Sequence, residues 1–205
     1  HYAAIMQTLT IFLAALIGLG AAPVAAHPHV WVTGEASFQF EEAKLARIGM
    51  TWQFDAFFSQ VLGADFDTNG DGAFDAKETQ AMKDQVFTSL KDFGYFTHLR
   101  TEGSDVERQF ESVENFSLRT DAGELVFSFD LVLAESIDPI SETIGLSLFD
   151  PTIYVDLILD GEKPTTISGA DGLECSIEYR QGNEVANQSY FFVPQEAWLN
   201  CSSTG

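Results

Sequence analysis

Positively charged side chains are scarce in this sequence. Lys and Arg together number 10 against 31 Asp and Glu, so the 205-residue chain has a formal net charge of −21 at pH 7. A surface this acidic repels nucleic acid and anionic lipid and attracts cations. We therefore expect no nucleic-acid partner, and we expect the charge to serve both solubility and cation binding.

The motifs of common hydrolases and nucleotide-binding folds are also missing. The sequence contains no G-x-S-x-G, no H-E-x-x-H and no phosphate-binding glycine loop. Ser and Asp are plentiful, but without a paired His they indicate no nucleophilic site. We therefore expect a binding protein and not an enzyme.

Cysteine is limited to Cys175 and Cys201. A low, even count in an exported protein predicts one disulfide, which would restrain the C-terminal part of the chain and contribute about 3 kcal/mol to stability. A metal site built on the two thiolates is the alternative. It is less favoured because no His or third Cys lies near either one in the sequence.

Residues 1–26 contain no charged side chain and are dominated, over residues 9–26, by apolar and small residues. The run ends in Val24-Ala25-Ala26, which places small residues where a signal peptidase cleaves. We expect a signal peptide at residues 1–26, a periplasmic or secreted domain at residues 27–205, and no integral membrane segment after cleavage, because the apolar run is too short to span a bilayer. An uncleaved N-terminal anchor is the alternative.

Strand-forming residues dominate most of the remaining chain. Segments of this type, separated by Gly, Pro and Asp turns, are residues 29–40, 47–54, 95–100, 108–119, 124–133, 144–149, 153–159, 173–180 and 188–193. They predict one mainly β domain of the α+β class, a sandwich or a twisted antiparallel sheet. Residues 55–66 and 76–93 have helical spacing instead. They predict an inserted helix–loop–helix at about residues 55–93, whose second helix runs about five turns to Gly94.

The loop between these helices, residues 67–78, matches the twelve-position EF-hand pattern. Ca²⁺ needs six to eight oxygen ligands, and Gly72 at position six permits the required turn. The expected ligands are Asp67, Asn69, Asp71, the backbone carbonyl of Ala73, Asp75 and Glu78. A constitutively filled structural site is favoured over a sensor because the motif is single. The alternative is an ordinary Asp- and Gly-rich surface turn.

Cleavage after Ala26 would expose His27-Pro28-His29 as the new N-terminus. Pro28 has no N–H, so the square-planar site that uses deprotonated backbone amides cannot form. Chelation by the α-amine and imidazole of His27, with His29 and His98 as further ligands, would suit Ni²⁺, Co²⁺, Zn²⁺ or Cu²⁺. Asp55 and Asp150 are weaker ligand candidates. The alternative is a frayed N-terminal strand whose histidines bind nothing.

Several segments occur in an order and spacing that resemble a known family. They are His27-Pro28-His29-Val30-Trp31-Val32, Trp52-Gln53-Phe54-Asp55 with Phe58-Ser59, the EF-hand-like loop, Ser89-Leu90-Lys91 before Tyr95-Phe96-Thr97, Phe149-Asp150-Pro151-Thr152-Ile153-Tyr154, and the two late cysteines. The chain resembles the periplasmic proteins of the domain of unknown function 1007 family, also described as the periplasmic component of an uncharacterised ABC-type transport system. Asp150-Pro151-Thr152 is typical of a turn as well as of the family.

The resemblance implies a role in handling Ni, Co or Zn beside a membrane transporter of divalent metal. We accordingly expect a periplasmic metal-binding accessory protein with a structural Ca²⁺ site. The alternative is a calcium-stabilised protein-interaction module without a transition-metal function. A copper redox enzyme ranks last, because it would need a second imidazole from within the fold and only His98 is available.

Overall fold

The computed structural model describes residues 30–160, 164–186 and 191–204, and these form a mainly β structure of the α+β class. This confirms the predicted fold class. The predicted signal peptide, together with His27 and His29, lies outside the described residues. No helix within the described ranges has the length and apolar character required to cross a membrane.

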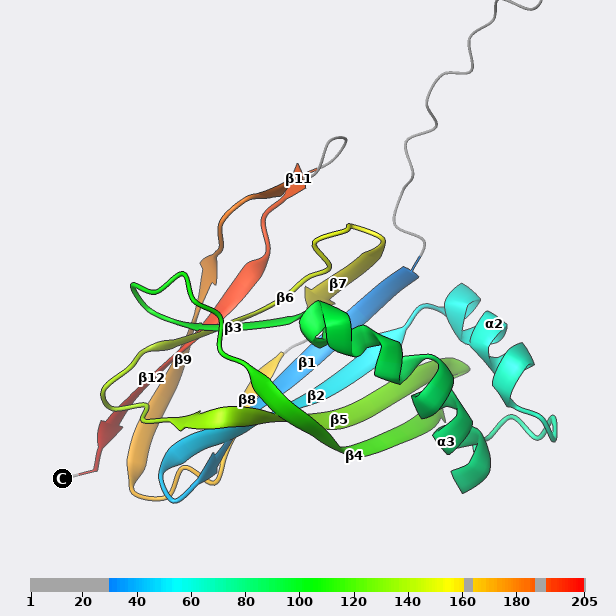
Figure 1. The fold of residues 1–205 in the computed structure, drawn as a ribbon, viewed down its shortest axis with the longest axis horizontal. Helices are drawn as coiled ribbons and strands as arrows, with labels where there is room; N and C mark the ends of the chain where they lie inside the picture. Colours follow the sequence, from blue (N-terminus) through cyan, green and yellow to red (C-terminus); the bar gives the residue numbers. More distant parts are fainter. Residues whose placement is uncertain (1–29, 161–163, 187–190, 205) are drawn as a thin grey trace, which may run out of the picture.

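A six-stranded sheet forms the larger part of the fold (Figure 1). Its strands are β1 (Val30–Glu41), β2 (Lys44–Phe54), β4 (Phe110–Asp121), β5 (Glu124–Ile137), β7 (Val155–Leu159) and β8 (Thr165–Ser168). The order is β4-β5-β2-β1-β7, and β8 also pairs with β1. Strands β4, β5, β2 and β1 pair antiparallel, whereas β7 and β8 run parallel to β1. The sheet is therefore mixed, with two parallel pairings that the alternative of a twisted antiparallel sheet did not include.

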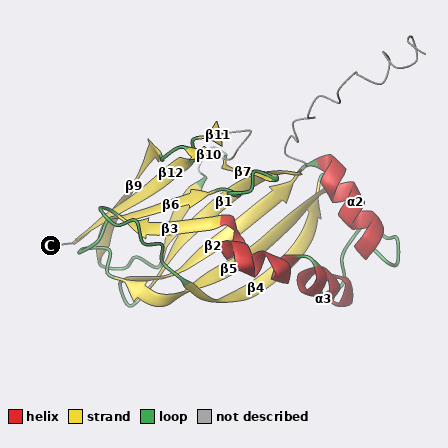
Figure 2. Ribbon diagram, turned by 45° about the horizontal axis from the view of Figure 1, so that its top comes forward, coloured by secondary structure: helices red, strands yellow, loops and turns green. Residues whose placement is uncertain are grey.

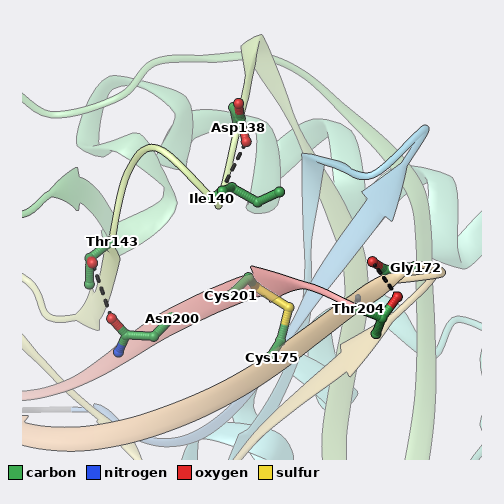
Figure 3. Close-up of a disulfide and its surroundings, with 8 residues drawn as sticks. All are labelled: Asp138, Ile140, Thr143, Gly172, Cys175, Asn200, Cys201 and Thr204. Atoms are coloured by element: carbon green, nitrogen blue, oxygen red, sulfur yellow. Dashed lines mark hydrogen bonds between the residues drawn. A yellow bond between two sulfur atoms is a disulfide. The ribbon is translucent and has the colours of Figure 1, made fainter.

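The second sheet has four antiparallel strands, ordered β3 (Thr97–Thr101), β6 (Ile144–Leu148), β12 (Gln195–Ser203) and β9 (Leu173–Gln181). A small ladder joins β10 (Val185–Ala186) to β11 (Phe191–Phe192). The predicted disulfide is present: Cys175 and Cys201 lie opposite each other on β9 and β12, with their Cα atoms 4.1 Å apart (Figure 3). Three strands were not predicted: β8, β10 and β12. The expected strand at residues 188–193 is seen only at Phe191–Phe192, and residues 187–190 lie outside the described ranges.

The helical insert begins at the end of the six-stranded sheet opposite the C terminus, and its last helix runs back over the sheet toward β3 (Figure 2). It consists of α2 (Ala56–Phe66), α3 (Ala76–Gln85) and a 3-10 helix, η1 (Phe87–Phe96). Asp55 caps α2 by accepting hydrogen bonds from the N–H groups of Phe57 and Phe58.

The prediction of one continuous helix over residues 76–93 is wrong. The α-helix ends at Gln85, and the chain continues as η1, where Gly94 and Tyr95 have positive φ angles. The reason is tertiary packing. The ring of Phe87 is 1% exposed and lies 4.7 Å from Phe129 and 6.5 Å from Trp52, centroid to centroid. The tighter winding carries η1 onto the aromatic face of the sheet, and this burial outweighs local helix propensity.

The hydrophobic core lies between the sheets and beneath η1. In β1 the side chains alternate, so that Val30, Val32, Ala36 and Phe38 are buried while their neighbours face outward. All five residues of β6 are buried. At Gly34 of β1, an added Cβ would lie 2.6 Å from a side-chain carbon of Leu148 in β6, which shows how closely the two sheets approach.

Candidate functional site

Five of the six predicted calcium ligands lie in the loop between α2 and α3, and the sixth, Glu78, is buried in the first turn of α3. The side-chain oxygens of the loop accept hydrogen bonds from the loop's own backbone. Asp67 Oδ1 accepts from the N–H groups of Gly70 (2.7 Å) and Asp71 (3.2 Å), and its Oδ2 accepts from Gly72 (2.8 Å). Gly70 and Gly72 have φ angles of 72° and 80°, which side-chain-bearing residues adopt with difficulty. The turn is therefore fixed by these two glycines and by one aspartate.

Two further side chains repeat this arrangement along the loop. Asn69 Oδ1 accepts from the N–H of Asp71 at 2.8 Å, and Asp71 Oδ1 accepts from the N–H of Ala73 at 2.9 Å. Each contact is between residues two apart, the geometry of an Asx turn. The side chains at loop positions three and five thus have defined orientations.

Glu78, at the twelfth position, is the most buried of the predicted ligands, with 3% of its surface exposed. Its Oε1 accepts from the N–H (2.8 Å) and hydroxyl (2.8 Å) of Thr68, and its Oε2 accepts from the N–H of Asp75 (3.1 Å). Asp75 in turn accepts from the N–H of Glu78, which completes a capping box at the start of α3. The backbone donor of Asp75, and after it the hydroxyl of Thr68, lower the pKa of Glu78 below its ordinary value.

The chemistry of these residues fits a hard cation. The donors are carboxylate, amide and carbonyl oxygens, and a carboxylate has about four acceptor positions, so one or two N–H contacts leave others for an ion. The carboxylates are not gathered around one point, however. Across the described residues, no group of three or more His, Cys, Asp or Glu side chains has the arrangement of a metal site.

Of the three histidines predicted as transition-metal ligands, only His98 lies within the described residues. The ring nitrogens of His98 both have partners: Nδ1 lies 2.7 Å from Glu107 Oε1 and Nε2 lies 3.1 Å from the carbonyl oxygen of Phe149. The His98 ring also stacks on that of Phe149, with centroids 3.6 Å apart. These contacts fix the imidazole within β3 and do not direct it to a metal site.

The two weaker candidates serve as local caps. Asp55 caps α2, and its Oδ2 also accepts from the N–H of Trp31 at 3.1 Å. Asp150 is 2% exposed, and its carboxylate accepts from the backbone N–H groups of Thr152, Tyr154 and Val155. The segment after Phe149 is accordingly a carboxylate-stabilised turn, as the sequence predicted.

An apolar groove of about 350 Å³, which the sequence did not predict, lies beside the helical insert. It is lined by residues of β1, β2, β5, β7, α2 and η1, by Val86 between α3 and η1, and by the segment that leads into β7. These residues are Val30, Val32, Trp52, Phe54, Phe58, Val86, Leu90, Phe93, Phe96, Phe127, Asp150, Thr152, Tyr154, Val155 and Leu157. Phe93 and Tyr154 remain 46% and 56% exposed. The volume and lining are typical of sites that bind small apolar molecules or apolar side chains.

The loop and the groove are joined through the helices. Phe58 projects from α2, before the loop, whereas Val86 and Leu90 follow α3, after it. The groove also contains the side chain of Trp52, which is 1% exposed and whose indole Nε1 has no hydrogen-bond acceptor among the residues that the structure describes. The loop therefore lies between the helical segments that supply two walls of the groove.

Comparison with known proteins agrees with the resemblance seen in the sequence. The profile of the family "Protein of unknown function (DUF1007)" matches residues 12–192. An uncharacterised 15.5 kDa protein from the trpE 3′ region of Spirochaeta aurantia is 29% identical over 138 residues, which cover 67% of this chain and 96% of that protein. An uncharacterised protein of Haemophilus influenzae is 25% identical over 150 residues, covering 73% of this chain and 69% of that protein.

Proposed function

Since the chain belongs to the DUF1007 family, whose function is unknown, we propose from its own geometry that it is a calcium-stabilised binding module. In this proposal Ca²⁺ binds the loop at Asp67, Asn69, Asp71, Ala73, Asp75 and Glu78. The ion holds α2 and α3 in a fixed relation, and the apolar groove beside them receives an apolar ligand or partner side chain.

The observation that carries the proposal is the orientation of the loop side chains by the loop's own N–H groups. Asp67, Asn69 and Asp71 each have an oxygen fixed in this way. Side chains that are already ordered lose less conformational entropy when they bind an ion. The net charge of −21 further favours a cation.

Calcium would act on stability by mass action. Extracellular calcium modules bind with dissociation constants of about 10⁻⁴–10⁻³ M. An ion present at about ten times its dissociation constant stabilises the folded state by about 1.4 kcal/mol. The disulfide between Cys175 and Cys201 supports a periplasmic or secreted location, because such bonds persist in oxidising compartments.

Calorimetric titration with CaCl₂ tests the proposal. We expect one site per chain, and we expect Glu78→Gln to weaken calcium binding at least tenfold, because it replaces a charged ligand by a neutral one of the same size. Glu174→Gln is the matched control, since Glu174 is exposed on β9, far along the chain from the loop. Absence of calcium binding in the unmodified chain, or equal loss in both variants, would overturn the proposal.

A transition-metal accessory protein is the second candidate. It is supported by the position of His29, one peptide bond before Val30, which begins β1 and lines the groove. In this proposal His27 and His29 bind Ni²⁺, Co²⁺, Zn²⁺ or Cu²⁺, and a membrane transporter of divalent metal is the partner. His98 would join them only by exchanging its contacts with Glu107 and Phe149.

One experiment distinguishes the two candidate functions. A chain beginning at His27 is titrated with each transition metal, beside a chain that has one extra residue before His27. The extra residue removes the α-amine ligand and leaves the calcium loop unchanged. Tight binding by the first chain only would support the accessory role, whereas equal behaviour of the two chains would exclude the N-terminal site.

A further inference from the structure

Strand β7 lies at the edge of the six-stranded sheet, beside β1 (Figure 1). It pairs with β1 over its whole length, from Val30↔Val155 to Gly34↔Leu159. On its other side, no described strand pairs with it. An unpaired strand edge presents a row of backbone donors and acceptors that another chain can use.

Two hydrogen bonds identify the backbone groups that face this edge. The N–H of Asp160 donates to the carbonyl of Gly34 in β1 at 3.2 Å, and the N–H of Val155 donates to Asp150 Oδ2 at 3.0 Å instead. Backbone groups alternate in direction along a strand. Asp156 and Ile158 therefore face β1, whereas the N–H and C=O groups of Leu157, and the N–H of Leu159, face away from it.

A groove of about 280 Å³ follows this edge. All five residues of β7 line it, although their side chains alternate between the two faces of the sheet. The groove therefore runs along the backbone edge and is not a pocket on one face. Its other lining residues include Phe149, Phe192, Val193 and Pro194.

The charges of the groove define what it attracts. Its lining residues include two carboxylates, Asp150 and Asp156, and no Lys or Arg. The carboxylate of Asp150 is already satisfied by the turn, whereas Asp156 is exposed on the strand. A basic side chain beside Asp156 would therefore be favoured by both the local carboxylate and the net charge of −21.

We propose that β7 binds an extended peptide of a partner protein in which Lys or Arg alternates with apolar residues. The peptide adds a strand to the sheet through hydrogen bonds to Leu157 and Leu159. Its apolar side chains lie on the face of Val155 and Leu157, and its basic side chains lie on the face of Asp156. This inference concerns a different surface from the calcium loop and does not depend on calcium.

Two occupants from the protein itself are disfavoured by the same charges. A second copy paired through β7 would bring two Asp156 carboxylates and two chains of −21 together. Residues 1–29 contain no Lys or Arg. A basic segment of a partner protein therefore complements the charge of this edge better than a second copy of the chain or residues 1–29.

The test uses fluorescence anisotropy with a labelled, acetylated Lys-Val-Lys-Val-Lys-Val-Lys-Val peptide and the full chain. A Lys-Pro peptide of equal charge cannot form the ladder because Pro lacks the N–H, and we expect it to bind at least tenfold more weakly. N-methylation of all Val residues, or of all Lys residues, blocks one peptide edge at a time. We expect one of these two peptides to bind and the other to fail, because only one edge faces β7.

Charge is tested with two variants of the protein. Asp156→Lys should weaken binding of the Lys-Val peptide at least tenfold, whereas Asp171→Lys, an equal charge change at an exposed site outside the groove, should change it less than threefold. Binding should persist in excess chelator, which separates this proposal from the calcium module. The proposal is overturned if the Lys-Pro peptide binds as tightly as the Lys-Val peptide, or if the two N-methylated peptides bind with equal affinity. It is also overturned if Asp156→Lys and Asp171→Lys change the affinity equally, or if the peptide acts only by dissociating a dimer of the protein.

Discussion

The Oε1 atom of Glu78 lies 2.8 Å from the backbone nitrogen of Thr68, ten residues earlier in the chain. The last position of the loop is thereby tied to its second position, and the first turn of α3 is tied to the end of α2. This contact joins the two ends of the loop within the helix–loop–helix insert. In the proposed function, calcium would compete with the backbone N–H of Thr68 for this carboxylate.

The pKa of Glu78 makes the stability of the insert depend on pH. Hydrogen bonds to the carboxylate lower its pKa in the folded protein below the ordinary 4.5. The unfolded chain therefore takes up a proton first as the pH falls, and the stabilisation is complete above about pH 4.5 and is lost as the pH falls through the folded pKa. We expect the calcium-free chain to lose stability below pH 4.5 more steeply than Glu78→Gln, as measured by urea unfolding at a series of pH values. Parallel curves for the two proteins would contradict this assignment.

Loss of the disulfide should destabilise the protein without changing its fold. The bond closes a loop of 26 residues between β9 and β12, and the chain-entropy estimate for such a loop is about 3 kcal/mol. The free energy of unfolding of the double variant Cys175→Ser with Cys201→Ser should therefore be lower by about 3 kcal/mol. We expect its urea midpoint to fall accordingly and its far-ultraviolet circular dichroism to be unchanged. If the unmodified chain has the same midpoint with and without reductant, the disulfide contributes little and this prediction is wrong.

The apolar groove should bind a neutral hydrophobic dye. Phe93 lines the groove and is 46% exposed, so Phe93→Asp removes apolar contact area and adds a charge with little loss of core packing. We expect N-phenyl-1-naphthylamine to bind the unmodified chain and to bind Phe93→Asp roughly tenfold more weakly, since burying a Phe side chain is worth about 1.5–3 kcal/mol. Val106→Asp is the control because Val106 is 73% exposed and does not line the groove. If all three proteins bind the dye equally, the dye binds outside the groove and this prediction is wrong.

Two glycines should respond to alanine in opposite directions. A Cβ at Gly145 in β6 would lie 2.8 Å from a ring carbon of Trp198, its partner across the ladder to β12. Gly145→Ala should therefore cost about 1–3 kcal/mol through overpacking. At Gly63 in α2 a Cβ would meet no atom within 4 Å, so Gly63→Ala should stabilise the helix by about 0.5–1 kcal/mol. Thermal unfolding of both variants measures the two effects, and a shift of the same sign in both would contradict them.

Local signals in the sequence predicted those elements in which neighbouring residues suffice to define the structure. The alternation of Val30, Val32 and Phe38 predicted β1, and the helical spacing before Asp67 predicted α2. The prediction of secondary structure failed where contacts between residues far apart in the sequence determine the local conformation. Nothing near Val86 indicates that the α-helix ends at Gln85; the reason is the aromatic face to which Phe87 packs, formed by residues 52, 116, 127 and 129. Strand β12 was missed although Ala197 and Leu199 are fully buried, because the strands that flank it lie far away in the sequence.

The sequence by itself determined the acidic charge, the mainly β class, the helix–loop–helix insert, the oxygen-rich loop and the two cysteines that pair. These depend on residue type and on spacing within a few turns or strands, where local hydrogen bonds and periodic burial dominate. Only the tertiary structure decided that β7 and β8 run parallel to β1, that His98 is held by Glu107 and Phe149, and that an apolar groove forms beside the loop. Each of these requires segments far apart in the chain to meet, and their contact energies have no signature in any one segment.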